Sequence, residues 1–398
     1  MKIAIIGGGP AGFAAAITLA KQNNKVTILE KNSDVLKKLL LTGNGKCNYF
    51  NNTQNITKYH SNSNIANLVK KENLDKVINF WNELGIIPIV KNGYFYPFSE
   101  TSSSIKSALV NKAYDLGVDI KCNEEVIDVL INGKQLLVIT NSYQELYDKV
   151  IVATGSVCYP KTGSTGFGYD LAKKFNMDLV DINPSLVQLN TNLGIEKLWK
   201  GIRTHVKVKH LENDQLIKEE EGEIQLTDYG ISGICIFNLS RNISIGLKNN
   251  QKETIEINFV PWVLSDLQSF LEERNVYLPN RNITQLCDAF LNYKLLYAIC
   301  NKLNIDPNKN WNDLSSTDKK LFCQSIRAMK VDIVGTKGFD NAQVCSGGIA
   351  LSELDEKFAA KKIDNLQFCG EVLDIDGDCG GYNLTIAILT GILAGEAR

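Results

Sequence analysis

The first thirty or so residues constrain the fold of this chain more than any other segment. Lys2–Ile6 is a short apolar run, which is typical of a strand buried on both faces, and Lys25–Leu29 is β-branched and alternating, which predicts a second strand. Between them, Ala11–Lys21 is rich in alanine and leucine and predicts a helix. The turn at residues 7–12 reads GGGPAG and satisfies the pattern G-x-G-x-x-G. The segment is therefore predicted to form a βαβ unit with a glycine-rich first turn.

Each conspicuous residue of this unit has a physical role in holding a dinucleotide. Gly7 permits the tight turn, Gly9 lets the backbone approach a pyrophosphate, and Gly12 lets the helix pack closely on the strand. The helix N-terminus offers free N–H groups and a partial positive charge to the phosphates. Glu30, at the end of the second strand, would accept hydrogen bonds from ribose hydroxyls and would repel a 2′-phosphate. The nucleotide held here is thus predicted to be FAD or NAD, and not NADP.

Two later segments favour FAD. Ile151–Ser156 (IVATGS) and Leu366–Asp376 (LQFCGEVLDID) both read as strands that end in glycine next to a polar residue. FAD reaches well past the first βαβ unit, and Glu371 or Asp376 can bind its ribityl hydroxyls. The N–H groups of Gly380–Leu384, which open the last helix, would point at the pyrimidine edge of the flavin.

Composition and charge set limits on the class of protein. The chain has 398 residues with 43 basic and 44 acidic side chains, and this balance favours neither a nucleic acid nor an anionic membrane as partner. The apolar run Leu384–Gly395 is too short to span a bilayer. The N-terminal apolar run ends in glycines, so we interpret it as a strand and not as a signal peptide, and we expect a cytoplasmic protein. Ten cysteines without a C-x-x-C pair predict no metal site.

The residue pattern, and with it the expected secondary structure, changes along the chain. Thr204–Ile257 is strand-like with an antiparallel character, Trp262–Lys330 has a helical pattern, and glycines return from Gly335 onward. Before the middle region, the pair Asn132-Gly133 between two apolar runs predicts a β-hairpin.

Motifs along nearly the whole chain resemble those of one family. They are GGGPAG, KKLLLTGNGKCN, GYFYPFS, ATGSVCYPKTGSTGFGYDLA, PSLVQL, LTDYGISG, GTKGFDNAQVCSGGIAL and GEVLDIDGDCGGYNL. The chain resembles the BaiN-like, or aminoacetone-oxidase-like, family of FAD-dependent NAD(P)/FAD oxidoreductases. It departs from the family pattern at Lys46, where arginine is common, at Phe167, where aspartate is usual, and at Ile234-Cys235, where proline-alanine is usual. The change at Phe167 leaves open what serves in place of that aspartate.

The resemblance implies an α/β architecture with a Rossmann-type FAD-binding domain of the glutathione-reductase-like kind. A β-rich, barrel-like domain is expected as an insertion, and a helical subdomain as an insertion within that. The implied boundaries are 1–186 and 345–398 for the FAD-binding domain, 187–261 and 328–344 for the β-rich domain, and 262–327 for the helical subdomain. The loop Gly163–Gly168 (GSTGFG) has the wrong spacing for a second dinucleotide fingerprint, so NADH or NADPH would have to dock transiently at the flavin.

The segment LLTGNGKCN is predicted to fold over FAD. It lacks the spacing of a Walker A loop, and its glycines would allow a close approach of the backbone. Lys38 and Lys46 would offer positive charge to cofactor or substrate, and Cys47 is interpreted as a packing residue near the flavin. The complete set of candidate cofactor-binding residues is Gly7, Gly9, Pro10, Ala11, Gly12, Glu30, Lys31, Lys38, Thr42, Gly43, Asn44, Gly45, Lys46, Cys47, Val126, Ala153, Thr154, Gly155, Gly370, Glu371, Asp376, Gly380, Gly381, Tyr382, Asn383 and Leu384.

Catalytic residues cannot be assigned from motifs. Hydride would enter and leave through flavin N5 while the protein orients the substrate. The three histidines carry no motif, and we interpret His60 as a loop residue and His205 and His210 as edge or surface residues of strands. Weak candidates for proton donors are Asp374, Tyr159 and Tyr382.

Four cysteines lie in motifs that should converge on the flavin: Cys47, Cys345, Cys369 and Cys379. A flavin-linked disulfide would need two of them with Cα atoms within roughly 7 Å. Because no spacing supports such a pair, we interpret all four as packing residues.

Four functions remain in competition. The first is NAD(P)H-fed reduction of a C=C or C=O bond in a small apolar molecule, and the resemblance adds that some family members act in dehydro-steroid (bile-acid) reduction. The second is oxidation of an amine. The third is flavin-dependent modification of RNA, against which the neutral charge counts. The fourth is flavin binding without turnover.

Overall fold

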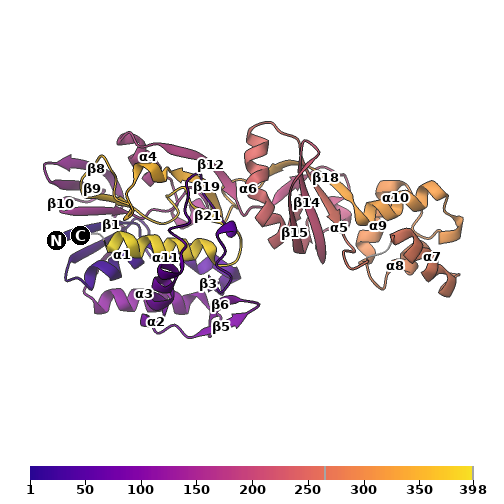
Figure 1. The fold of residues 1–398 in the computed structure, drawn as a ribbon, viewed down its shortest axis with the longest axis horizontal. Coiled ribbons are helices and arrows are strands. Elements are labelled where there is room, and N and C mark those ends of the chain that lie inside the picture. Colours follow the sequence, from indigo (N-terminus) through magenta and orange to yellow (C-terminus); the bar gives the residue numbers. More distant parts are fainter. Residues whose placement is uncertain (264–265, 397–398) are drawn as a thin grey trace. The chain divides into compact units, whose positions relative to one another are not determined.

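The computed structural model describes residues 1–263 and 266–396. The chain forms two units, which are described separately: Met1–Asn183 with Gln343–Arg398, and Pro184–Ala342 (Figure 1). The chain enters the second unit once and returns once, as expected for an insertion. The finer division into three domains at the boundaries given above stays a prediction.

The first unit is built on a five-stranded parallel sheet. The strands lie in the order β20-β11-β1-β2-β7, and Ile5 of β1 lies between Ile28 of β2 and Ile151 of β11. The predicted βαβ unit is confirmed, because β1 and β2 are parallel neighbours joined by helix α1. The bounds are β1 Lys2–Ile6, α1 Pro10–Ala20, β2 Lys25–Glu30, β7 Asp119–Cys122, β11 Lys149–Val152 and β20 Leu366–Phe368.

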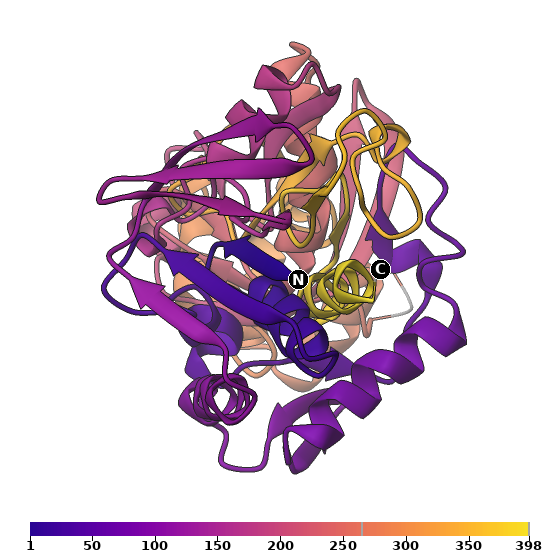
Figure 2. The same ribbon diagram turned by 90° about the vertical axis from the view of Figure 1, so that its left-hand side faces the viewer.

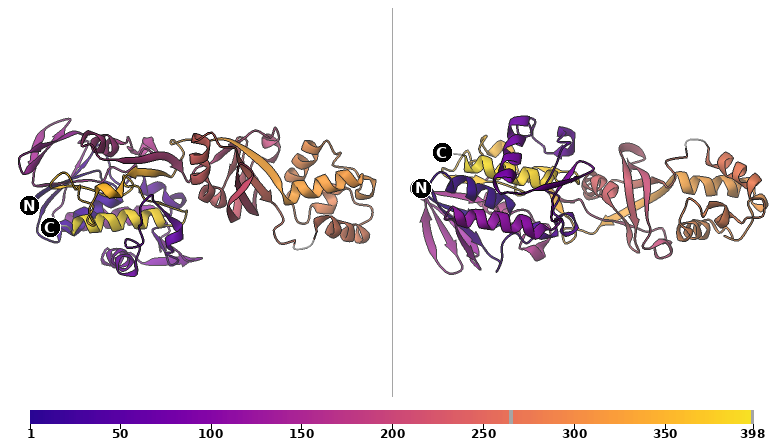
Figure 3. Two further views of the ribbon diagram at one scale, coloured as in Figure 1. Left: turned by 45° about the horizontal axis from the view of Figure 1, so that its top comes forward. Right: turned by 90° about the horizontal axis from the view of Figure 1, so that it is seen from below.

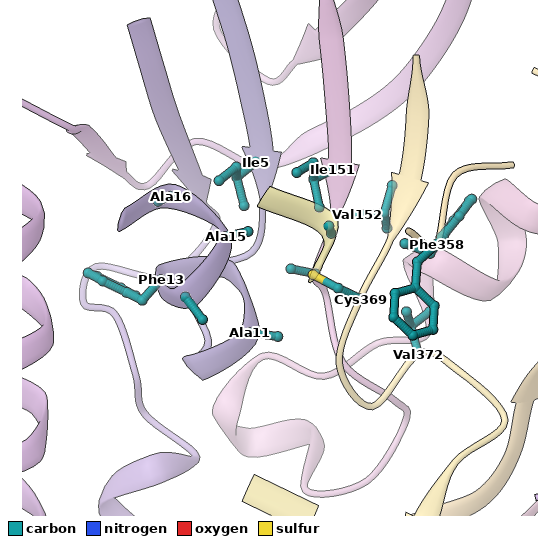
Figure 4. Close-up of a cluster of buried hydrophobic side chains, with 14 of the residues drawn as sticks. Ile5, Ala11, Phe13, Ala15, Ala16, Ile151, Val152, Phe358, Cys369 and Val372 are labelled. Carbon is teal, nitrogen blue, oxygen red and sulfur yellow. The ribbon is translucent and has the colours of Figure 1, made fainter. Parts of the chain in front are cut away.

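The C-terminal helix α11 (Tyr382–Gly395) packs directly against α1 (Figure 2). Glycine makes this contact close: a Cβ added at Gly391 would lie 2.3 Å from the carbonyl oxygen of Ala11 and 2.9 Å from the Cβ of Ala14. Each helix is buried on most of its surface and carries apolar residues on almost every side. The two ends of the chain therefore share one core, part of which Figure 4 shows around Phe13, Ile151 and Cys369.

Smaller sheets and helices complete the first unit. The predicted hairpin is confirmed, with Asn132 ending β8, Gly133 at φ +63° and β9 returning antiparallel. Strand groups are β8-β9-β10, β3-β6-β5, β4-β21 and β12-β19. The bounds are β3 Phe50–Asn51, β4 Tyr59–His60, β5 Pro88–Lys91, β6 Tyr94–Pro97, β8 Val126–Asn132, β9 Gln135–Thr140, β10 Gln144–Tyr147, β12 Leu179–Ser185, β19 Val344–Ile349 and β21 Asp376–Gly377, with α2 Lys71–Glu83, α3 Ser102–Asp115, α4 Phe167–Lys174 and the 3₁₀ turns η1 Leu39–Gly45, η2 Ile56–Lys58, η3 Pro160–Thr162 and η5 Leu351–Glu353.

The second unit combines a closed barrel with a group of helices. The barrel order is β13-β16-β15-β14-β17-β18, and helices α7 to α10 gather beyond one end of it (orange in Figure 3). The bounds are β13 Leu189–Thr191, β14 Arg203–Glu212, β15 Gln215–Leu226, β16 Gly230–Ser232, β17 Glu253–Asn258, β18 Met329–Thr336, α5 Glu196–Trp199, α6 Ile234–Lys248, α7 Leu267–Tyr277, α8 Ile283–Cys287, α9 Tyr293–Leu303, α10 Ser316–Arg327 and the 3₁₀ turn η4 Trp311–Asp313. The α/β fold class with a barrel-like insertion is thus confirmed.

The antiparallel strands expected within 204–257 are confirmed as β14 to β17, but two details of the middle region were wrong. The strand-like region 204–257 contains helix α6, whose buried residues Cys235, Leu239 and Ile243 recur at helical spacing. His210 is not a surface residue: it is fully buried and its Nε2 contacts the Glu253 carboxylate. The two side chains pair with each other, while His210 Nδ1 and Glu253 Oε1 have no hydrogen-bond partner among the described residues.

Among the described residues, no helix is both long enough and apolar enough to cross a membrane.

Candidate functional site

The glycine-rich turn after β1 has the geometry expected for a phosphate cradle. Gly7 has φ +108°, and a Cβ there would lie 2.6 Å from the carbonyl oxygen of Ala153. A Cβ at Gly12 would lie 2.2 Å from the carbonyl oxygen of Gly7, which explains why the helix can pack this closely on the turn. A Cβ at Gly9, in contrast, would find only one atom, at 4.0 Å. Gly9 therefore borders open space into which a ligand can come close to the backbone.

Helix α1 begins in this turn without a side-chain cap. Gly9 is the N-cap residue and Pro10 is the first helical residue, so Ala11 and Gly12 supply the amides of the first turn. Amides in a first turn have no partner within their own helix, and they carry the positive end of the helix dipole. The turn thus offers donors and positive potential to a pyrophosphate.

Glu30 ends β2 next to this turn and is almost completely buried. Its Oε2 accepts a hydrogen bond from the amide of Gly8 at 2.9 Å, and its Oε1 accepts from the backbone and the side-chain amide of Asn32 at 2.8 and 2.6 Å. These bonds fix the carboxylate at the carboxyl end of the parallel sheet, where nucleotides bind in such folds. Lys31, the next residue, contacts the Thr165 hydroxyl at 3.5 Å.

The end of β11 forms the neighbouring wall. The amide of Ala153 donates to the carbonyl of Ile6, and the buried hydroxyl of Thr154 has no hydrogen-bond partner among the described residues. Gly155 has φ +72° and nothing within 4 Å of an added Cβ. The chain therefore leaves the sheet with open space beside it.

A cluster of polar side chains joins three distant segments. Lys38 Nζ donates to both oxygens of Glu371, at 2.9 and 2.6 Å, and Ser156 Oγ donates to Glu371 Oε1 at 2.7 Å. Burial lowers the pKa of the Lys38 ammonium, but Glu371 and the thiols of Cys158 and Cys345 outweigh burial, and the pKa ends above its usual 10.5. Lys38 is thus held as a cation beside Glu371. Gly370 has φ +81°, and a Cβ added to it would lie 2.7 Å from the Cβ of Ala11.

The entrance to α11 is a second uncapped helix N-terminus. Gly380 and Gly381 have φ +128° and +88°, and Gly381 is the N-cap residue with no side-chain cap. Asn383 Oδ1 accepts a hydrogen bond from the Gly377 amide at 2.9 Å, and Asn383 Nδ2 donates to the Gly377 carbonyl at 2.7 Å. This side chain therefore holds the turn. Tyr382 and Leu384 are buried, and the Tyr382 hydroxyl donates to the carbonyl of Thr53.

The loop after β2 folds as the irregular turn η1. Thr42 Oγ1 donates to the carbonyl of Leu39 at 2.6 Å, and Gly43, Asn44 and Gly45 take left-handed conformations. Cys47 is fully buried, and burial raises the pKa of its thiol to about 12, with a smaller opposing effect from Thr42. A thiol held neutral in this way fits the interpretation of Cys47 as a packing residue. Lys46 is half exposed and pairs with Glu100 at 3.2 Å.

Two predicted cofactor residues lie in small sheets. Val126 is the buried first residue of β8, and Asp376 is a buried residue of β21 that pairs with His60 of β4. The expectation that His60 lies in a loop was wrong, because it belongs to β4, and its Nε2 lies 3.0 Å from Asp378 Oδ1.

The structure also places Asp374 and Tyr159, two weak candidates for proton donors, and Phe167, which departs from the family pattern. Asp374 is buried and its Oδ2 accepts from the amide of Asn62 at 2.8 Å. Tyr159 has φ +56° and precedes η3. Phe167 begins α4 and packs against the core of the first unit, so an apolar contact stands where the resembling family has a carboxylate.

Sequence reasoning missed Ser156 of the polar cluster and the cysteine contact beside it. Ser156 follows Gly155 directly in IVATGS, so its place next to the strand end was a signal for it. Cys158 Sγ lies 3.0 Å from Cys345 Sγ, although 187 positions separate the two residues, and no local pattern points to this contact.

One family model and several known proteins are similar to this chain over nearly its whole length. The family model described as "HI0933-like protein Rossmann domain" matches residues 1–397. A 3-dehydro-bile acid delta(4,6)-reductase of Clostridium scindens is 32% identical to this chain over 402 residues, with 100% of this chain and 98% of the relative covered. A ribosomal RNA dihydrouridine synthase of Escherichia coli is 25% identical, with 95% of this chain and 93% of the relative covered.

Two solved structures match this chain at low sequence identity. A 3-ketosteroid-delta4-(5alpha)-dehydrogenase from Rhodococcus jostii RHA1 is 14% identical with a TM-score of 0.49, and it is matched over 99% of this chain and 95% of its own length. A flavocytochrome c3 fumarate reductase is 16% identical with a TM-score of 0.48, over 99% of this chain and 77% of its own.

Proposed function

The chain belongs to the HI0933-like family and is an FAD-dependent oxidoreductase, and we propose that it uses electrons from NAD(P)H to reduce a C=C or C=O bond of a small apolar molecule. The observation that carries the proposal is the relation to the bile-acid reductase, which extends over the whole of this chain at 32% identity. The polar features of the first unit support the cofactor part, because a glycine cradle, two uncapped helix N-termini and Glu30 together suit an adenine dinucleotide.

Each element of the site would have a separate task. The α1 N-terminus would bind the pyrophosphate, and Glu30 would accept hydrogen bonds from the ribose. Glu371, held by Lys38 and Ser156, would accept from the ribityl chain. FAD supplies hydride transfer when bound, and the amides before α11 would stabilise negative charge on its pyrimidine edge.

The first experiment tests the cofactor and the electron donor. The purified protein should be yellow, and anaerobic NADH or NADPH should bleach the flavin absorbance. Under the same conditions, a 3-oxo-4,6-diene steroid should restore the absorbance and appear as its reduced product by mass spectrometry. If an amine reduces the flavin and neither nicotinamide does, the protein is an amine oxidase and the proposal is wrong.

A second candidate, modification of RNA, is favoured by the two relatives named as ribosomal RNA dihydrouridine synthases, at 25% and 26% identity. The even balance of 43 basic and 44 acidic side chains speaks against it, since RNA-binding proteins usually carry a basic surface. Incubating unmodified ribosomal RNA with the reduced protein separates the two functions: formation of dihydrouridine without steroid turnover would establish the second.

A further inference from the structure

Two cysteines from distant parts of the chain meet beside the polar cluster. Cys158 lies in the loop after β11, and Cys345 is the second residue of β19. Both belong to the first unit, both are buried, and their Sγ atoms are 3.0 Å apart as free thiols. The two sulfurs are in direct contact, about 1 Å farther apart than the roughly 2.05 Å of a disulfide bond.

The polar cluster of Lys38, Ser156 and Glu371 lies next to this thiol pair. The amide of Cys158 donates to Ser156 Oγ at 3.1 Å, and the same hydroxyl donates to Glu371. Lys38 completes the group through its ion pair with Glu371. The backbone of Cys158 is therefore linked through Ser156 to Glu371, which we expect to hold the ribityl chain.

The two thiols are not equivalent. A hydrogen bond from Cys158 lowers the pKa of the Cys345 thiol below its usual value against the opposing effect of burial, and the same contact raises the pKa of Cys158. Reactive cysteines are those with thiolate character, whereas burial raises the pKa of a lone cysteine such as Cys369 to about 12. Cys345, whose sulfur also receives hydrogen bonds from the Ser156 hydroxyl and the Val157 amide, is the better placed nucleophile, and Cys158 is the partner that resolves it.

We propose that Cys158 and Cys345 form a peroxide-sensitive site that closes reversibly to a disulfide. The Cys345 thiolate attacks one oxygen of hydrogen peroxide, the O–O bond breaks, and a sulfenic acid and hydroxide form, with the hydroxide taking up a proton to become water. Cys158 then attacks the Cys345 sulfur, an Sγ–Sγ bond forms, and the hydroxyl group leaves with the Cys158 proton as water. In total, two thiols and one peroxide give one disulfide and two waters.

Peptide mass spectrometry of the FAD-loaded protein tests this site without any substrate. Cleavage after lysine places Cys158 alone in peptide 150–161 and Cys345 alone in peptide 338–357, while Cys47 lies alone in peptide 47–58. After treatment with hydrogen peroxide and alkylation, the first two peptides should be recovered joined, with a mass lower by two hydrogens than their sum. Dithiothreitol should separate them, and the Cys47 peptide should remain a simple alkylated thiol.

Matched variants identify the roles of the two sulfurs. Cys345→Ser should abolish the linked species, and Cys158→Ser should leave a Cys345 sulfenic acid that dimedone traps. Cys122→Ser, which removes a partly exposed cysteine elsewhere in the unit, should form the link as the unchanged protein does. Recovery of both peptides separately in the unchanged protein, or a link to another cysteine, would overturn the proposal. Because the readout is a mass, this result does not depend on whether the protein reduces a steroid.

Discussion

At the scale of single residues, Glu30 combines a structural and a binding role. Its carboxylate receives the Gly8 and Asn32 amides and thereby holds the glycine turn against the end of β2. The same carboxylate stands where a ribose is expected, and its charge strengthens any hydrogen bond that a hydroxyl donates to it. Sequence position alone pointed to this residue, because it depends only on the length of the βαβ unit.

Replacing Glu30 by glutamine should weaken FAD binding by roughly tenfold, because hydrogen bonds to a charged group are worth about 1.5–3 kcal/mol. The glutamine oxygen can still accept from Gly8, but its NH2 group then faces the two Asn32 donors, so the melting temperature of the apoprotein must be measured alongside the affinity. Flavin fluorescence titration of the apoprotein measures the affinity. Glu125→Gln, at an exposed position, is the matched control. Equal affinity in Glu30→Gln and the unchanged protein would remove Glu30 from the ribose.

At the scale of elements, the contact between α1 and α11 depends on the absence of side chains. Gly391 allows the backbone of α11 to approach Ala11, and Gly395 allows it to approach Thr18, whose Cβ lies 2.7 Å from an added Cβ. The two helices come from opposite ends of the chain, and α1 also supplies the phosphate-binding N-terminus. Packing at this contact therefore positions the candidate site.

Gly391→Ala should destabilise the first unit by about 1–3 kcal/mol, because the new methyl group would overlap the Ala11 backbone. The same substitution in an exposed helix would stabilise it by about 1 kcal/mol, so the sign of the effect is diagnostic. Urea unfolding measures it. Gly335→Ala, in strand β18 of the second unit, controls only for an added methyl group without a close contact, since the nearest atom to its added Cβ is 3.6 Å away. A stabilised Gly391→Ala protein would contradict the close contact.

The end of α11 should make stability depend on pH. Burial raises the pKa of the Glu396 carboxyl, but the ammonium groups of Lys76 and Lys357, 2.6 and 3.1 Å away, outweigh it, and the pKa lies below its usual 4.5. Because the pKa of the folded state is the lower one, the ion pairs stabilise the protein above about pH 4.5, and this contribution is lost as the pH falls through the pKa of the folded state.

Glu396→Gln should therefore cost up to about 1 kcal/mol at pH 7, the range for partly exposed ion pairs, and less at pH 3, below the usual pKa of 4.5. Urea unfolding at both values, with Glu356→Gln at an exposed position as the control, checks the difference. A cost that stays the same at pH 3 would assign the effect to packing and not to charge.

At the scale of the whole molecule, all candidate cofactor residues fall in one of the two units. They come from residues 7–155 and 370–384, which both lie within the first unit. FAD should accordingly stabilise the first unit directly, by about 2.7 kcal/mol at a concentration one hundred times its dissociation constant.

Calorimetry of the apoprotein should show two transitions, of which FAD raises only one. Limited proteolysis during heating assigns them, because fragments from residues 184–342 should become accessible at a temperature that FAD does not change. A single transition that FAD raises as a whole would show that the two units unfold together.

Sequence by itself determined the features that depend on neighbours along the chain. The first βαβ unit, the glycine turn with Glu30 and the Asn132-Gly133 hairpin each follow from a few consecutive residues whose backbone preferences are local. The same local rules failed at α6, where apolar residues in a region of strand-like composition follow the helical period and pack against the barrel.

Only the tertiary structure decided which distant side chains meet. Lys38 and Glu371 are 333 positions apart, and Cys158 and Cys345 are 187 apart, so no spacing rule connects them. His210 shows the same limit, because its burial against Glu253 depends on how β14 and β17 pair in the barrel. Such contacts form only when distant segments pack together in the folded chain. Local backbone preferences act over a few residues and cannot bring these groups together.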